Sequence, residues 1–224
     1  MIEYFLPILA VFMGVGIVLA TNHKKTTFSK LLLSFSGAFL LAVTLFNLLP
    51  EVYEHLDKVV VGTCIMGGIL IQIILEFFSK GAEHGHIHLH GDHHQFPWML
   101  FLSLCLHSFL EGFPIHHHET MVYGVFIHKI PIAMLITTFL LHAEYSRFQI
   151  IIFLSVFAVM TPLGTLVSYS GLIPLGAINY INALVIGIFL HISTTILFES
   201  NQGHSFNLTK LLSIIFGFAI AYFV

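Results

Sequence analysis

Charged residues are scarce in this sequence. Asp, Glu, Lys and Arg together make up 8% of the 224 residues, while 57% of the residues are hydrophobic. A soluble domain carries about 25% charged residues, so the composition excludes a soluble globular protein. The formal net charge of −3 gives no reason to expect nucleic acid as a partner. The composition predicts an all-α polytopic membrane protein whose solvent is the lipid bilayer.

Cysteine is also rare. Cys64 and Cys105 both lie inside apolar runs, where a thiol packs as a small hydrophobic group, so we expect no disulfide. The first four residues, Met1 to Tyr4, lack the basic residues that open a secretory signal peptide. We therefore expect the first apolar segment to remain in the protein as a membrane helix.

Long apolar runs, in contrast, fill most of the chain. A spanning helix needs about 20 mostly apolar residues, and eight segments approach that length. They form one transmembrane domain over residues 1–224, and their expected bounds are 4–22, 29–49, 59–79, 96–115, 120–141, 148–170, 177–198 and 206–224.

Basic residues are distributed unevenly over the connections between these segments. Among the even-numbered connections only the second carries one, Lys58, and the odd-numbered connections carry or adjoin Lys24, Lys25, Lys30, Lys80, Arg147 and Lys210. Cytoplasmic loops of membrane proteins are enriched in Lys and Arg. We therefore expect odd-numbered connections in the cytoplasm and both termini outside, in a bacterial inner (plasma) membrane.

Histidine is far more frequent than folding requires, with 16 residues. The third connection, at about 81–95, alternates histidine with other residues, and imidazoles in such a segment bind Zn²⁺ and similar ions. The alternative is a solvated linker with incidental metal affinity. The candidate residues for metal capture by this cytoplasmic loop are His84, His86, His88, His90, His93 and His94.

Two histidines and one glutamate stand inside apolar segments. His107 and Glu111 are four residues apart and share one face of a helix, with Pro114 following, so the helix is expected to kink or to free a carbonyl oxygen there. His128 also precedes a proline, Pro131, by three residues. A histidine alone in a core is more often a satisfied structural residue. Together these three side chains form a donor set that suits Zn²⁺, Fe²⁺ or Mn²⁺.

Lys129 follows His128 directly and lies at the same membrane depth. A lysine there costs roughly 2.5–3.5 kcal/mol on insertion scales, so we expect it to pair with Glu111. The alternatives are that its long side chain reaches the membrane surface, or that it points into a water-filled crevice. Asn47 is expected to form a polar wall of an ion pathway or a hydrogen bond between helices, and His191 is a further isolated histidine.

These residues together resemble the ZIP (Zrt/Irt-like protein) family of divalent metal transporters. Family members carry His-Ser/Asn-x-x-Glu-Gly in the fourth span, a His-Lys or His-Glu pair in the fifth and Pro-x-Gly in the sixth. The second span of this chain has Asn47-Leu-Leu-Pro50-Glu51 where the family has His-Leu-Leu-Pro-Glu. The other matching residues are His107, Ser108, Glu111, Gly112, His128, Lys129, Pro162 and Gly164.

The resemblance implies eight spans, outside termini, commonly a homodimer, and metal bound between spans four and five. It makes His107, Glu111 and His128 the primary ligands, with Asn47 and Ser108 as further candidates. Members with a two-metal centre have acids or an amide at positions that here are Ser108, Lys129, Ile132 and Thr161. We therefore expect one ion, with the Lys129 ammonium in place of the second.

The favoured function is uptake of Zn²⁺ into the cytoplasm, with Fe²⁺, Mn²⁺ or Cd²⁺ as other substrates and no organic cofactor. One alternative is an intramembrane zinc hydrolase, which needs a metal-bound water and a general base. The helical motif His-Glu-x-x-His is absent and no second intramembrane acid stands near the site in the sequence, so we do not expect an enzyme. Another alternative is a non-transporting metal sensor of the same fold.

Overall fold

The computed structural model describes residues 1–21, 27–79, 96–115, 119–199 and 208–224, and within these ranges it contains helices and no strand. The predicted all-α fold is confirmed. The candidate histidines between His84 and His94 lie outside the described residues. The elements are α1 (Ile2–Ala20), α2 (Thr27–Val43), the π-helical turn η1 (Thr44–Leu48), α3 (Leu49–His55), α4 (Lys58–Ser79), α5 (Trp98–Glu111), α6 (Glu119–His142), α7 (Arg147–Tyr169), α8 (Leu175–Glu199) and α9 (Leu208–Tyr222).

Each of the eight expected segments coincides with a helix or a continuous run of helices. Among the described residues, six of these are long and apolar enough to cross a membrane. The two shorter apolar helices are α5, with 14 residues, and α9, with 15. The architecture is that of an all-α polytopic membrane protein.

Helix α5 is shorter than expected because it ends at Glu111 instead of continuing past Pro114. The Phe113 N–H donates to the Leu110 carbonyl at 3.2 Å, so the carbonyl that the proline ring displaces is satisfied within a closing turn. A proline has no N–H and cannot continue the helix. The expected kink is thus a helix end, and the candidate ligand Glu111 occupies the last turn of α5.

The second segment is continuous from α2 to α3 but contains one wide turn. The Leu49 N–H donates to the Thr44 carbonyl, five residues back, as in a π-helix. Pro50, which follows, has no N–H to offer to the carbonyl of Phe46. The wide turn accommodates this missing donor and places Asn47 within η1.

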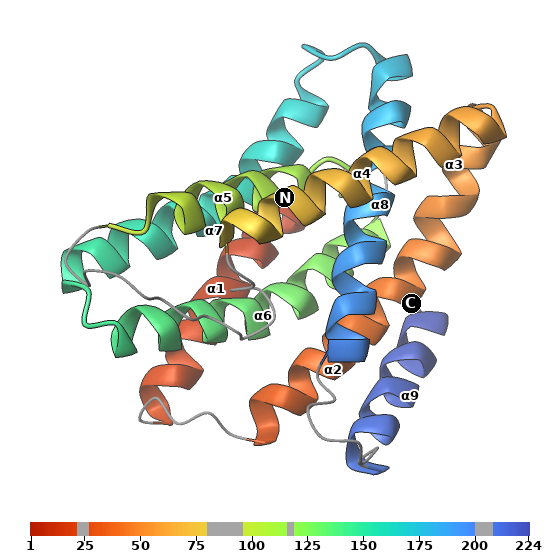
Figure 1. The fold of residues 1–224 in the computed structure, drawn as a ribbon. Helices are drawn as coiled ribbons and strands as arrows, with labels where there is room; N and C mark the ends of the chain where they lie inside the picture. Colours follow the sequence, from red (N-terminus) through yellow and green to blue (C-terminus); the bar gives the residue numbers. More distant parts are fainter. Residues whose placement is uncertain (22–26, 80–95, 116–118, 200–207) are drawn as a thin grey trace.

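The helices pack as two groups (Figure 1). The first group consists of α1, α5, α6 and α7, and the second consists of α2, α4, α8 and α9 together with η1 and α3. The groups meet mainly where α2 contacts α6 and where α4 contacts α5. In Figure 1, α9 lies along the rod formed by α2 and α3, close to the marked C-terminus.

Glycines permit the closest helix contacts in both groups. A Cβ atom on Gly112 or on Gly164 would overlap backbone atoms of the facing helix, so α5 and α7 touch backbone to backbone. Gly68 and Gly187 make an equivalent contact between α4 and α8. These contacts fix the relative position of the paired helices because any larger residue would force them apart.

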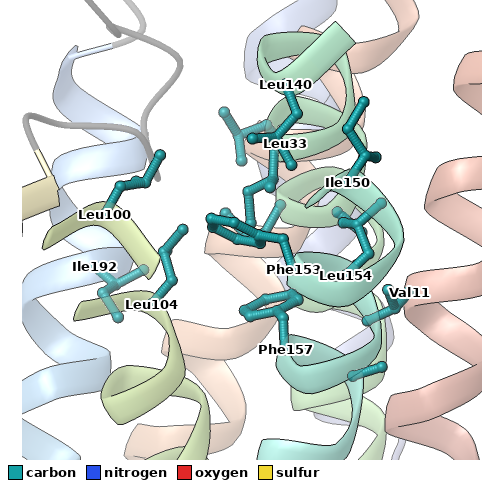
Figure 2. Packing of buried hydrophobic residues seen from close by; sticks show 14 of the residues in the cluster. Val11, Leu33, Leu100, Leu104, Leu140, Ile150, Phe153, Leu154, Phe157 and Ile192 are labelled. Carbon is teal, nitrogen blue, oxygen red and sulfur yellow. The ribbon is translucent and has the colours of Figure 1, made fainter. Parts of the chain in front are cut away.

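An apolar cluster fills the space where α5, α6 and α7 of the first group face α8 of the second (Figure 2). Figure 2 shows Phe153 and Phe157 on one helix facing Leu100, Leu104 and Ile192. We call this set the inner cluster, and its buried members include Leu100, Leu104, Ile132, Ile136, Leu140, Ile150, Phe153, Phe157, Ile188 and Ile192.

Candidate metal centre

Three candidate ligands of the sequence analysis meet in one buried cluster. His107 and Glu111 come from α5 and His128 comes from α6, and their ligand atoms all lie within 4.8 Å of one another. The His107 Nε2 atom is 2.8 Å from Glu111 Oε1, and the His128 Nε2 atom is 4.0 Å from the same oxygen. Among the described residues this is the only such group. The predicted proximity of His107 and Glu111 is confirmed, and His128 joins them from α6, while their role as metal ligands stays a prediction.

The cluster is closed to solvent. The exposed fractions are 2% for His107, 2% for Glu111 and 1% for His128. The two imidazole rings meet nearly edge to face, with centroids 6.4 Å apart and planes at 84°. Two nitrogens and one carboxylate oxygen converge from different helices, and this donor set matches the preference of Zn²⁺ and of related divalent ions.

Lys129 lies beside this cluster and not at the membrane surface. Its side chain is 1% exposed, and its Nζ atom is 2.9 Å from Glu111 Oε2. The structure thus shows the ion pair that the cost of a buried ammonium led us to expect, and it does not show the side chain reaching solvent. The two oxygens of Glu111 have different partners, since Oε1 faces the imidazoles and Oε2 faces the ammonium.

Two hydroxyl groups and one ring complete the surroundings of the ammonium. Lys129 Nζ donates to Ser108 Oγ at 2.6 Å and to Thr161 Oγ1 at 2.7 Å. It also lies 4.5 Å from the centroid of the Phe157 ring, within the range of a cation–π contact. Ser108, a further ligand candidate, is therefore a partner of Lys129. Its role as a metal ligand stays a prediction.

Helix α7 holds the end of α5 through a row of hydroxyl groups. Thr161, Thr165 and Ser168 donate to the carbonyl oxygens of Ser108, Gly112 and Phe113 at 2.9, 3.0 and 3.1 Å respectively. The last carbonyls of a helix have no partner within the helix. Here α7 supplies those partners, so the ligand-bearing end of α5 is attached to α7.

Asn47 and His191 lie elsewhere. The Asn47 amide donates to the Thr120 hydroxyl on α6, so it forms the inter-helix hydrogen bond that was one of its two expected roles, and its role as a ligand stays a prediction. His191 Nε2 is 2.7 Å from Glu76 Oε2, which joins α8 to α4. His191 lies outside the cluster formed by His107, Glu111 and His128.

Sequence reasoning missed three partners. Phe157 and Thr161 are one helical turn apart on α7 and both face Lys129, and Glu76 pairs with His191. Their signal was weak because a threonine or a phenylalanine in an apolar helix is ordinary. Only the polar residues Thr161, Thr165 and Ser168, which recur at helical spacing within one apolar segment, mark the face that contacts α5.

Comparison with known proteins agrees with this geometry. A family model described as ZIP Zinc transporter matches residues 79–224, a range that contains α5 to α9 and therefore all three ligands and Lys129. A curated relative, "Zinc transporter ZIP1" of Danio rerio, is 30% identical over 89 residues. That match covers 37% of this chain and 30% of the relative's length.

Proposed function

Because the chain belongs to the ZIP zinc transporter family and is an integral multi-pass membrane protein, we propose that it carries a divalent metal cation across the membrane. The observation that supports this function is the buried meeting of His107, Glu111 and His128 between α5 and α6. A cation cannot cross hydrocarbon unless ligands replace its water. This cluster supplies such ligands within the bundle.

Zinc is the substrate that the donor set fits best. Neutral imidazole nitrogens and one carboxylate oxygen are common zinc ligands, and Fe²⁺, Mn²⁺ and Cd²⁺ are further candidates. Mg²⁺ and Ca²⁺ prefer sites built from oxygen atoms alone, and this cluster offers one carboxylate. The chemistry therefore favours zinc and related ions over the hard cations.

The centre holds one metal ion. A second cation would need to lie on the free side of Glu111, and the Lys129 ammonium occupies that side at 2.9 Å from Oε2. The ammonium carries a positive charge and cannot accept a metal ion. Lys129 thus takes the place of a second ion.

Transport is favoured over hydrolysis by the acids near the centre. A zinc hydrolase needs a general base beside the metal-bound water. Glu111 is the only acidic residue that is buried among the described residues, and its two oxygens already face the imidazoles and the ammonium. No second buried acid is found among the described residues to act as the base.

The orientation in the membrane is proposed from the distribution of basic residues, and uptake of zinc into the cytoplasm is proposed separately from it. With the odd-numbered connections in the cytoplasm, the chain forms one transmembrane domain with outside termini in a bacterial inner membrane, and zinc enters the cytoplasm. The loop at about 81–95 would gather zinc on that side through its histidines. The homodimer rests on the family resemblance alone.

Uptake of labelled zinc into proteoliposomes tests the function. Wild-type protein should show saturable uptake, and His107→Ala, Glu111→Ala and His128→Ala should each lower it by more than about a hundredfold, since changes to partners of metal ligands alone reach 10–100-fold. The matched control is His142→Ala, because His142 lies on α6 with His128 but is exposed.

Each variant must first elute as a monodisperse species, because removing Glu111 leaves the Lys129 charge uncompensated. Wild-type protein that takes up no zinc, cadmium, iron or manganese would refute transport. Near-normal uptake by folded Glu111→Ala would refute the centre.

A further inference from the structure

Each of the three protons of the Lys129 ammonium has a hydrogen-bond acceptor. An ammonium has three donors and no acceptor, and Lys129 Nζ has three acceptors: Ser108 Oγ at 2.6 Å, Thr161 Oγ1 at 2.7 Å and Glu111 Oε2 at 2.9 Å. The three acceptors come from two helices, α5 and α7, while Lys129 comes from α6. The ammonium is therefore held at the junction of three helices in a fixed position.

Each hydroxyl group turns its own proton away from the ammonium. The Thr161 hydroxyl donates to the Ser108 carbonyl at 2.9 Å. The Ser108 hydroxyl has the Phe157 carbonyl at 3.3 Å and Thr161 Oγ1 at 3.0 Å as its acceptors. With their protons used in this way, both hydroxyl oxygens present lone pairs to Lys129, as a bound cation requires.

We propose that Thr161, with Ser108, is a positioning residue that fixes the Lys129 ammonium and so keeps Glu111 Oε1 available to the metal ion. This inference rests on the proposed function and assigns a role to a helix, α7, that supplies no ligand. Two neutral oxygens take two of the ammonium protons, so only one proton bonds to Glu111. The carboxylate thereby keeps one oxygen directed at His107 and His128.

Loss of the Thr161 hydroxyl would change how the three protons of the Lys129 ammonium are distributed among their acceptors. Ser108 and Thr161 are both 0% exposed, so bulk water does not reach them, and a water molecule could replace the missing acceptor only if a cavity opened. The freed ammonium proton would turn to Glu111, the nearest acid. More of the carboxylate charge would then be drawn to the ammonium, and Oε1 would become a weaker metal ligand.

The test compares variants at Thr161 in full-length protein. Thr161→Val keeps the shape but removes the hydroxyl, and it should raise the apparent KM for zinc on the order of tenfold, the size expected for a lost hydrogen bond to a charged group, with the maximal rate changed less than about twofold. Thr161→Ser restores the hydroxyl and should return KM to within about twofold of wild type.

Thr165→Val is the matched control. Thr165 is also 0% exposed on α7, and its hydroxyl donates to the Gly112 carbonyl at 3.0 Å, but it is no partner of the ammonium. It should lose stability without the KM change. An unchanged KM in Thr161→Val, an equal rise in Thr165→Val, or no recovery in Thr161→Ser would each overturn the proposal.

A Lys129→Met background separates positioning from a direct effect. There Thr161→Val should change KM by less than about twofold, because the group through which Thr161 acts is gone. A tenfold change that persists in that background would overturn the proposal. If Lys129→Met does not fold, the serine recovery and the Thr165→Val control decide.

Equilibrium binding distinguishes this inference from the proposed function. Zinc competition with a chromophoric indicator, in detergent, isolates the binding component that Glu111→Ala removes. If wild-type protein binds zinc at that component without transporting it, the proposed function fails. The same fold-changes in Kd across the Thr161 and Thr165 variants still support or overturn the positioning role.

Discussion

The Glu111 carboxylate has a different kind of partner on each of its two oxygens. It faces two imidazoles through Oε1 and an ammonium through Oε2, and it is buried at the end of α5. Without metal, Glu111 and Lys129 neutralise each other, which makes burial of both tolerable. With a divalent ion added, the site carries a net charge of +2, so binding is weakened relative to a site without the lysine. A transporter needs such weakening because it must release what it binds.

The number of ions follows from the same charge balance. Anomalous scattering or native mass spectrometry on protein that lacks residues 84–94 should count one zinc per protomer in the centre, and none in Glu111→Ala. The deletion removes the loop histidines, which would otherwise add ions to the count. Two ions between α5 and α6 of one protomer would contradict the role of Lys129 as the substitute cation.

Removing the charge of Lys129 tests the charge balance of the centre in a second way. Lys129→Ala lowers the net charge of the occupied site from +2 to +1, so the affinity for zinc should rise and the selectivity among divalent ions should change. Isothermal calorimetry with zinc and manganese on matched preparations measures both. A loss of thermal stability with unchanged affinity and selectivity would assign Lys129 a structural role alone.

At the scale of helices, the contact between α5 and α7 sets the geometry of the centre. The backbones touch at Gly112 and Gly164, and the Thr161 hydroxyl donates to the Ser108 carbonyl of α5. Ser108 and Thr161 reach Lys129 together only because these helices are so close. The position of the Lys129 ammonium therefore depends on the spacing between α5 and α7 as well as on the side chains that bind it.

Gly164→Ala should separate α5 from α7. Its Cβ would overlap the Phe109 carbonyl, and overpacking of this kind costs about 1–3 kcal/mol. Both the melting temperature in detergent and the zinc affinity should fall. Gly67→Ala is the control, since nothing lies within 4 Å of the added Cβ; it should leave affinity unchanged and slightly favour the helix. If both changes lowered the zinc affinity equally, the α5–α7 contact would not be what sets that affinity.

At the scale of the whole molecule, the centre belongs to one group of helices. All three ligands, Lys129 and Thr161 lie on α5, α6 and α7, whereas α2, α4, α8 and α9 contribute none of these residues. The first group can therefore shift against the second without dismantling the donor set. The contacts between the groups, α2 with α6 and α4 with α5, are where such a shift would occur.

The expected orientation is testable by single-cysteine labelling. In a protein with Cys64→Ala and Cys105→Ala, an impermeant reagent added outside should label Glu54→Cys, which lies in the second connection region, and should not label His88→Cys in the third. Inverted vesicles should give the opposite pattern, because lysine-rich connections remain in the cytoplasm. Labelling of position 88 from outside alone would contradict the proposed topology.

The sequence predicted the helices and the proximity of His107 to Glu111 because both depend on local information, and the role of the cluster as a metal centre stays a prediction. Apolar runs reveal membrane helices, and the spacing of four between His107 and Glu111 places both on one helix face. The charge cost of Lys129 also pointed to its partner Glu111. These predictions needed only residue type, spacing and depth in the membrane.

The remaining features depend on contacts between distant segments. The acceptor role of Thr161 arises because α7 approaches α5 within backbone contact. The spacing of hydroxyl residues marks one polar face of α7 but does not say which helix that face contacts. The pairing of His191 with Glu76 joins residues 115 positions apart. The π-turn at Thr44–Leu48 also escaped prediction, because a proline alone does not say whether a helix bends, widens or ends there.

The inner cluster has a consequence for how ions move through the protein. Six residues of this cluster lie on one side of the centre. They precede His107 on α5 and Thr161 on the parallel α7, and they follow His128 on the antiparallel α6. These residues are Leu100, Leu104, Phe153, Phe157, Ile132 and Ile136. Along α5 this hydrocarbon seal extends for about 10 Å, at 1.5 Å per residue. On that side the centre is bordered by buried apolar side chains. If the proposed transport holds, we expect discrete turnovers timed by helix rearrangements on the microsecond-to-millisecond scale, and an electrode across the membrane should record no stepwise single-channel current.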